Sequence, residues 1–179
     1  MKKLCVFCGS AEGNSPAYLE MARSLGTMMA KNNIALVYGG ASIGVMGAIA
    51  DAVMENGGVV IGIIPKLLVN YEIAHKDLTE LHIVEDMHQR KKMMYDRSDA
   101  FLSLPGGMGT LDEMFEILTW SQLKLHTKPC FIYNFMGFYD SLLAYLNHSH
   151  KEGFIKGQHI SMLSEIKEKE ELLKVITSL

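Results

Sequence analysis

SLPGGMGTLDE, residues 103–113, decides the fold predicted for this chain. It overlaps the apolar residues 100–104, which predict a short buried strand, and Pro105 ends that strand. Three glycines within the next four positions leave the turn without side chains. The stretch therefore predicts a strand that leads through a bare backbone turn into a helix.

A capping-box pattern follows the glycine turn. Thr110 is a preferred N-cap residue and Glu113 lies three positions later, so we expect the helix to begin at Thr110. The N-terminus of a helix offers unpaired N–H groups and the positive end of the helix dipole, and both favour a phosphate. The alternative is that the glycines only allow the helix to pack closely on the sheet.

Predicted strands and helices alternate along the chain. The strands expected are residues 4–7, 34–38, 59–64, 81–84, 100–104 and 130–133. The helices expected are residues 16–31, a stretch ending near 55, 86–97, the one beginning at 110, 138–148 and 165–176. Because parallel strands need helical crossovers, we predict an α/β fold. Residues 1–179 would form a single doubly wound, Rossmann-like domain, with a mainly parallel sheet of about six to seven strands and helices on both faces.

Glycine-containing turns after predicted strands indicate where a ligand would bind. They contain Gly9 with Ser10, Gly39 with Gly40, and Gly106 with the glycines that follow it. Ligands of doubly wound sheets bind at the carboxyl ends of strands, near the switch in strand order. The first turn lacks the G-x-G-x-x-G of NAD sites, and neither of the later turns continues into the lysine of a P-loop. We therefore expect an anion site for a mononucleotide.

Charged residues on two predicted helices are candidates for the chemistry of this site. Arg90 and Lys91 lie on the helix that precedes the glycine turn, which would place their charge near a phosphate. Such a pair is more often only the solvated face of a helix. Glu113 and Glu116 are expected on a face of the next helix that does not meet the core, with Trp120 one turn further on. An aromatic ring beside two carboxylates suggests a subunit interface.

The composition narrows the classes of partner. A formal net charge of −3 and a pI near 6.2 argue against a broad nucleic-acid surface. No apolar run is long enough to cross a membrane, and the first nine residues are too short for a signal peptide. The odd number of cysteines suits buried thiols in a reducing compartment, and His148, His150 and His159 lack the spacing of a zinc site. We expect a soluble, cytoplasmic protein that binds no metal, nucleic acid or membrane.

Two motifs together resemble a known family. PGGMGTLDE, residues 105–113, with MHQRK, residues 87–91, closely resembles the LONELY GUY family of phosphoribohydrolases, many of which were mislabelled lysine decarboxylases. The resemblance extends from residues 5–10 to residues 128–129 and covers most of the chain. It implies hydrolysis of the N-glycosidic bond of nucleoside 5′-monophosphates, notably N6-prenylated adenosine monophosphates in cytokinin biosynthesis, to free base and ribose 5-phosphate. It also implies no cofactor, and a homodimer with the site near the interface.

The resemblance assigns roles to individual residues. Arg90 and Glu113 correspond to the catalytic pair of the family. Many relatives have a third glycine where this chain has Ala41, and we expect the extra methyl group to reshape the approach to the site. The residues expected to contact the substrate or its phosphate are Ser10, Gly39, Gly40, Glu72, Lys91, Gly106, Gly107, Met108, Gly109, Thr110, Leu111, Asp112 and Thr119.

The sequence is compatible with functions other than hydrolysis to different degrees. A lysine decarboxylase is disfavoured, because the sequence shows no recognisable pyridoxal-phosphate lysine with its partners. The alternative from another class is a non-catalytic carrier of a nucleotide or phosphorylated cofactor, because related doubly wound proteins bind such ligands without cleaving them. A structural dimer with a vestigial site is a third reading. The physiological substrate stays open among prenylated nucleotides, AMP and other monophosphates.

Overall fold

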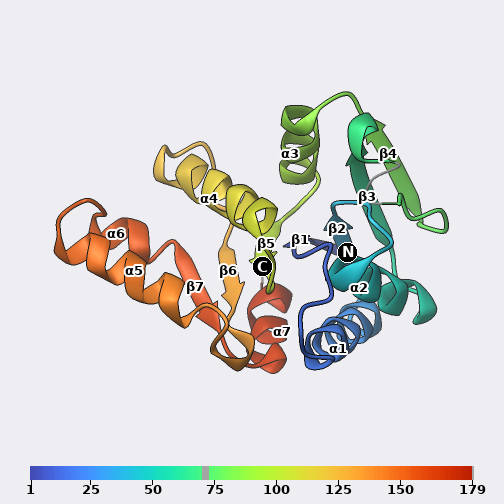
Figure 1. Cartoon of the computed structure of the whole chain (residues 1–179), viewed down its shortest axis with the longest axis horizontal. Coiled ribbons are helices and arrows are strands. Elements are labelled where there is room, and N and C mark those ends of the chain that lie inside the picture. Colours follow the sequence, from blue (N-terminus) through green and yellow to red (C-terminus); the bar gives the residue numbers. More distant parts are fainter. Residues whose placement is uncertain (70–72, 179) are drawn as a thin grey trace.

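Seven parallel strands form one sheet in the computed structural model, which describes residues 1–69 and 73–178 (Figure 1). Their order across the sheet is β4-β3-β2-β1-β5-β6-β7. The inner strands β2, β3, β5 and β6 are buried along their whole length, as expected of a parallel sheet that is covered on both faces. The bounds of the strands are β1 (Lys2–Phe7), β2 (Ile34–Tyr38), β3 (Val60–Pro65), β4 (Glu80–Val84), β5 (Ala100–Ser103), β6 (Cys130–Tyr133) and β7 (Leu163–Ile166).

The strand order reverses between β1 and β5. From β1 the chain adds β2, β3 and β4 on one side, and then returns to pair β5 with the other side of β1. The loops that follow β1 and β5 therefore leave the sheet side by side, and the Gly9 N–H donates a hydrogen bond of 3.3 Å to the Pro105 carbonyl. This is the switch point at which doubly wound sheets bind ligands.

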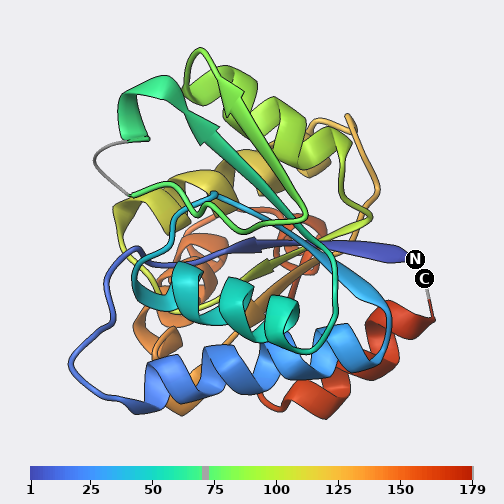
Figure 2. The same ribbon diagram turned by 90° about the vertical axis from the view of Figure 1, so that its right-hand side faces the viewer.

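Helices cover both faces of the sheet, which confirms the predicted α/β fold (Figure 2). One face carries α1 (Ala17–Lys31), α2 (Gly44–Glu55) and α7 (Lys169–Thr177). The other carries α3 (Met87–Asp96), α4 (Met108–Gln122) and α5 (Asp140–Lys151). Three short elements complete the described chain: η1 (Lys66–Leu68), η2 (Phe135–Gly137) and α6 (Gly157–Ile160).

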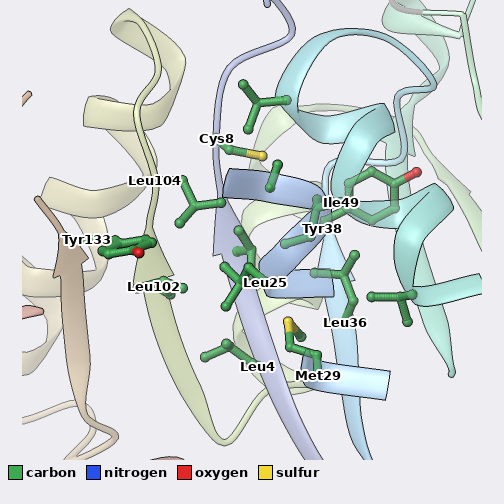
Figure 3. Packing of buried hydrophobic residues seen from close by; sticks show 14 of the residues in the cluster. Leu4, Cys8, Leu25, Met29, Leu36, Tyr38, Ile49, Leu102, Leu104 and Tyr133 are labelled. Carbon is green, nitrogen blue, oxygen red and sulfur yellow. The ribbon is translucent and has the colours of Figure 1, made fainter. Parts of the chain in front are cut away.

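Leucines from neighbouring strands build the core on the first face. Leu4 of β1, Leu36 of β2 and Leu102 of β5 are fully buried, and Figure 3 shows them beside Leu25 and Met29 of α1. Each such burial stabilises the fold by roughly 2 kcal/mol. This packing holds β1 and β5 rigidly next to each other and so supports the switch point.

The predicted helix over residues 165–176 is wrong in its first part. Leu163–Ile166 is the edge strand β7, which pairs in parallel with β6, and α7 starts only after Glu168. Glu168 and Glu171 form a capping box at that start. A four-residue edge strand depends on backbone pairing with β6, a segment distant in sequence, which outweighs the local pattern. Elsewhere β2 and β6 have the expected bounds.

Other expectations concern cysteines, membranes and metals. All three cysteines are buried and free, as expected. Within residues 1–69 and 73–178, no helix combines the length and apolar character needed to cross a bilayer. The same part of the chain has no group of three His, Cys, Asp or Glu side chains arranged to hold a metal ion.

Candidate functional site

A cavity of about 240 Å³ lies at the switch point, and we call it the switch-point cavity. Its walls come from the loops that follow β1 and β5, from the first turns of α2 and α3 and from the first two turns of α4. The residues that line it are Cys8, Gly9, Ser10, Met46, Met87, Arg90, Gly107, Met108, Gly109, Thr110 and Glu113. Seven of the predicted site residues outside the catalytic pair lie at positions 106–112, and four of these, Gly107, Met108, Gly109 and Thr110, are among the lining residues.

The helix after this turn begins earlier than the sequence predicted. α4 starts at Met108, with Gly107 as an extended N-cap and no side-chain cap, so the predicted capping box is wrong. The Thr110 side chain packs against the Gly106 backbone instead, and the Glu113 carboxylate lies next to Arg90. The first turn of α4 therefore presents backbone N–H groups at the cavity without a competing side-chain oxygen.

The second glycine turn does not offer a second set of unpaired N–H groups for a phosphate. The Val45 N–H donates to the Ala11 carbonyl at 3.3 Å and the Met46 N–H to the Gly9 carbonyl at 3.1 Å, so the start of α2 is already occupied. Gly44 has φ +62° and brings α2 this close, because a Cβ there would lie 2.7 Å from the Ala11 nitrogen. Among the described residues, nothing outside α4 accepts a hydrogen bond from its first N–H groups, so of these two helix starts that of α4 can receive an anion.

Gly39, Gly40 and Ala41 serve packing in this structure. Gly40 lies against Ile63 and Ile64, and none of the three lines the switch-point cavity. Ala41 is fully buried in the core and its methyl group does not line this cavity, so its effect on the approach to the site stays a prediction. Gly39 has a different importance, because its backbone lies directly against the Arg90 guanidinium.

Arg90 and Glu113 form a buried ion pair in the cavity wall. Arg90 is 4% exposed and Glu113 7%, and Nη2 lies 3.7 Å from Oε1. Nη2 also donates to the Gly39 carbonyl at 3.4 Å, whereas the buried Arg90 Nε has no hydrogen-bond partner among residues 1–69 and 73–178. Glu113 thus lies on the buried side of α4, not on the non-core face predicted. A permanent cation with a spare donor, beside a carboxylate and a helix N-terminus, suits a phosphorylated ligand.

Lys91 points away from this cavity. Its Nζ lies 2.9 Å from Glu116 Oε2 and 3.2 Å from Asp112 Oδ2, which links α3 to α4. Burial lowers the pKa of Lys91, but hydrogen bonds to Glu116 and Asp112 outweigh that effect and leave the pKa raised, so the ammonium stays charged. Neither Lys91, Asp112 nor Leu111 lines the cavity, and Leu111 packs against the core on the second face.

Thr119 lies further along α4. It lines a separate apolar cavity of about 130 Å³ between α4, α5 and β7. It lies nine positions after Thr110 on the same helix, a rise of roughly 14 Å. Thr119 and the glycine turn of one chain therefore cannot touch the same phosphate, and a substrate contact by Thr119 stays a prediction that needs a second subunit. Glu72, another predicted contact, lies outside the described residues.

A third cavity adjoins the glycine turn on its other side. It has a volume of about 280 Å³, and it shares Gly9, Ser10 and Gly107 with the switch-point cavity. Gly106 lines this cavity, and Tyr18 and Phe138 form its aromatic wall, with ring centroids 6.0 Å apart. No pattern in the sequence pointed to this aromatic wall. Cys8 and Met46 were also missed as lining residues, although their positions just after β1 and the second glycine turn were a usable signal.

Two neighbouring glycines should separate packing from binding. A Cβ at Gly106 would overlap Thr110 Oγ1 and lie 2.8 Å from the Gly9 nitrogen, whereas a Cβ at Gly109 would meet nothing within 4 Å. We expect Gly106→Ala to lower the free energy of unfolding by about 1–3 kcal/mol through overpacking. Gly109→Ala should keep that stability but weaken phosphate binding. Thermal denaturation and calorimetric titration with phosphate check this, and equal destabilisation by both variants would contradict it.

Comparisons with known sequences place the chain among enzymes. A family model described as "Possible lysine decarboxylase" matches residues 46–176. A cytokinin riboside 5′-monophosphate phosphoribohydrolase of Rhodococcoides fascians is 48% identical over 155 residues, which is 86% of this chain and 78% of the relative. The Arabidopsis thaliana relatives of the same name are LOG1, 51% identical over 86% of this chain and 72% of the relative, and LOG4, 44% identical over 96% and 80%.

Solved structures share the fold at lower identity. The molybdenum cofactor binding protein from Rippkaea orientalis has a TM-score of 0.72 at 22% identity, covering 99% of this chain and 97% of that one. The molybdenum cofactor carrier protein from Chlamydomonas reinhardtii has a TM-score of 0.73 at 17% identity, with 99% of both chains covered. These identities show a common fold and no more.

Proposed function

This chain belongs to the LONELY GUY family of cytokinin riboside 5′-monophosphate phosphoribohydrolases, and from this we propose that it hydrolyses the N-glycosidic bond of nucleoside 5′-monophosphates. The products are the free base and ribose 5-phosphate. Adenosine monophosphates with an N6-prenyl group are the proposed substrates, because the relatives are named for cytokinin riboside monophosphates. The family-model description as a lysine decarboxylase is not adopted, since no pyridoxal-phosphate lysine is recognisable in the sequence.

One observation supports this proposal above the others. The buried Arg90–Glu113 pair and the uncapped N-terminus of α4 line the same cavity at the switch point. A phosphate on the N–H groups of residues 107–110 would place the attached ribose within that cavity, beside the carboxylate. A nucleoside monophosphate carries both a phosphate and a glycosidic carbon, so one molecule can meet both groups.

The proposed mechanism uses Glu113 as the group that acts on the ribose. Its carboxylate stabilises positive charge on the ribosyl ring as the bond between C1′ and the base nitrogen breaks. It also takes a proton from the attacking water, whose oxygen forms the new bond to C1′. Arg90 orients oxygens of the ribose phosphate through its guanidinium. The net reaction adds one water, with a hydroxyl on C1′ and a proton on the departing base.

Cys8 is a potential nucleophile in the cavity that this mechanism does not use. Burial, followed by the nearby Glu113 carboxylate, raises the pKa of the Cys8 thiol well above its usual value, so it stays protonated and a poor nucleophile. We expect Cys8→Ala to keep kcat within about threefold of the wild type, far from the loss expected for a covalent catalyst. Steady-state kinetics check this, and loss of all turnover would assign the thiol a role in the reaction.

The activity is tested with purified protein, AMP and isopentenyl-AMP. Chromatography should detect adenine or prenyladenine, together with ribose 5-phosphate, and a panel of other monophosphates then ranks the substrates. Nucleotide binding without release of base would instead favour a carrier. Neither binding nor release would indicate a structural protein with a vestigial site.

A homodimer and a cytoplasmic location complete the proposal. Leu123 and Leu125, just after α4, are 61% and 63% exposed, which suits a surface covered by a second subunit. In such a dimer Lys91, Asp112, Glu72 and Thr119 are proposed as further substrate contacts. The three free cysteines suit a reducing compartment such as the cytoplasm. Light scattering of the purified protein measures the number of subunits.

A further inference from the structure

A short segment after η1 is fastened to the second glycine turn. The Ser42 N–H and hydroxyl both donate to the Ile73 carbonyl, at 3.0 and 2.7 Å. Ala41 and Ala74 form an antiparallel bridge, and the His75 N–H donates to the Gly40 carbonyl at 2.9 Å. Every one of these contacts joins residues 73–75 to residues 40–42.

The His75 side chain locks this segment to α2. His75 is 8% exposed, and its Nε2 lies 2.9 Å from Oδ1 of Asp51 on α2. The Asp77 N–H donates to Nδ1 at 3.3 Å, so Nδ1 is the acceptor and Nε2 carries the proton that Asp51 accepts. The tautomer and the ring orientation are thus both fixed. We call these contacts of residues 73–75 with residues 40–42 and Asp51 the His75 clip.

The clip lies one residue from the backbone that supports Arg90. Gly40, which His75 holds, directly follows Gly39, whose carbonyl accepts from Arg90 Nη2 at 3.4 Å. A Cβ at Gly39 would lie 3.2 Å from Arg90 Cζ, so the guanidinium rests on this peptide unit. Any movement of the turn changes the position of Nη2 relative to Glu113, at present 3.7 Å from Oε1.

We propose that His75 and Asp51 are positioning residues for Arg90, acting through the Gly39–Gly40 peptide unit. This rests on the proposed hydrolysis. Neither side chain lines the switch-point cavity, so neither is expected to touch the substrate. Their hydrogen bond holds the second glycine turn at the place where Arg90 meets both the ribose phosphate and Glu113. From its sequence this turn was expected to bind phosphate. In the structure it supports the Arg90 guanidinium instead.

The test compares kcat and KM for AMP in His75→Ala, Asp51→Ala and Asp51→Asn. We expect His75→Ala and Asp51→Ala to lower kcat by about 10-fold to 100-fold, as for displacement of a reacting group by up to about 1 Å. KM should change much less. Asp51→Asn should recover most of the loss, because the amide oxygen still accepts from Nε2. Asp51 is half exposed, so its replacement tests the bond without opening a cavity.

His82→Ala is the matched control. His82 Nε2 also lies 2.9 Å from a carboxylate, Oε2 of Glu80, but this pair is on the edge strand β4 and does not line the switch-point cavity. It should leave kcat unchanged. A wild-type kcat in both His75→Ala and Asp51→Ala, or an equal loss in His82→Ala, would overturn the proposal.

A double-mutant cycle separates positioning from simple loss of stability. In an Arg90→Lys background, His75→Ala should cause no further loss of kcat, because the guanidinium it positions is gone. If His75→Ala lowers kcat by the same factor in the Arg90→Lys background as in the wild type, the proposal is wrong. Hydrogen exchange of the Ser42 and His75 amides should be faster in Asp51→Ala, and this readout needs no turnover. If the wild type releases no base, the proposed function fails while the exchange measurement still tests the clip.

Discussion

Glu113→Gln is expected to reduce the release of free base from AMP by about 100-fold to 10,000-fold while the nucleotide still binds. The amide keeps the size of the side chain and one oxygen beside Arg90, but it can neither accept a proton from water nor offset positive charge on the ribose. Steady-state kinetics measure the first effect and calorimetric titration with AMP the second.

Glu80→Gln is the control for this variant. Glu80 Oε2 lies 2.7 Å from Arg97 Nη1, so it is also a glutamate paired with an arginine, but at the start of β4 and far from the switch point. It should keep wild-type turnover. If Glu113→Gln turns over AMP as fast as Glu80→Gln does, the assignment of Glu113 as the group that acts on the ribose is wrong.

Gly39→Ala is expected to lower kcat by about 100-fold, since a displacement of about 1 Å in a reacting group has effects of that size. The new Cβ would overlap Arg90 Nη2 and lie 3.0 Å from Met46 Sδ. Both are ends of flexible side chains, so the chain should fold while the guanidinium moves away from Glu113. Kinetics with AMP and thermal denaturation measure the two effects.

Gly26→Ala is expected to have the opposite effects, with lower stability and unchanged kcat. A Cβ at Gly26 in α1 would lie 2.6 Å from the Ile49 carbonyl oxygen of α2, so it should lower the free energy of unfolding by about 1–3 kcal/mol. It is remote from the cavity, and kcat measured well below the melting temperature should stay at the wild-type value. Equal losses of kcat in the two variants would mean that Gly39→Ala acts through stability alone.

Several features of the site were predictable because they depend on local sequence. Strand 100–104 followed by the PGGMG turn indicated backbone N–H groups at a helix start, and α4 does begin there. Alternation of strands and helices indicated a parallel sheet, and therefore a ligand site where β1 and β5 diverge. Arg90 and Glu113 were named from motifs, and the structure brings them together.

Other features depended on contacts between distant segments. β7 forms because its backbone pairs with the edge of β6, and residues 163–166 alone contain no pattern that predicts this pairing. The capping box was wrong because Thr110 meets Gly106 and Glu113 meets Arg90, and these contacts compete with the local cap. The family resemblance marks Lys91 and Thr119 as substrate contacts, but neither residue lines the switch-point cavity of the single chain.

Local sequence patterns were enough to predict the α/β fold, a helix start after β5 and, through motifs, the pair of residues proposed for the chemistry. Which of the two glycine turns offers free backbone N–H groups to the cavity depends on contacts between distant segments. The carbonyls of Gly9 and Ala11 accept hydrogen bonds from the amides at the start of α2. The amides at the start of α4 face the cavity instead. Glycine leaves the backbone without a side chain in both turns. Whether a carbonyl from the loop after β1 then bonds to that backbone depends on how distant segments pack, so the local sequence does not predict it.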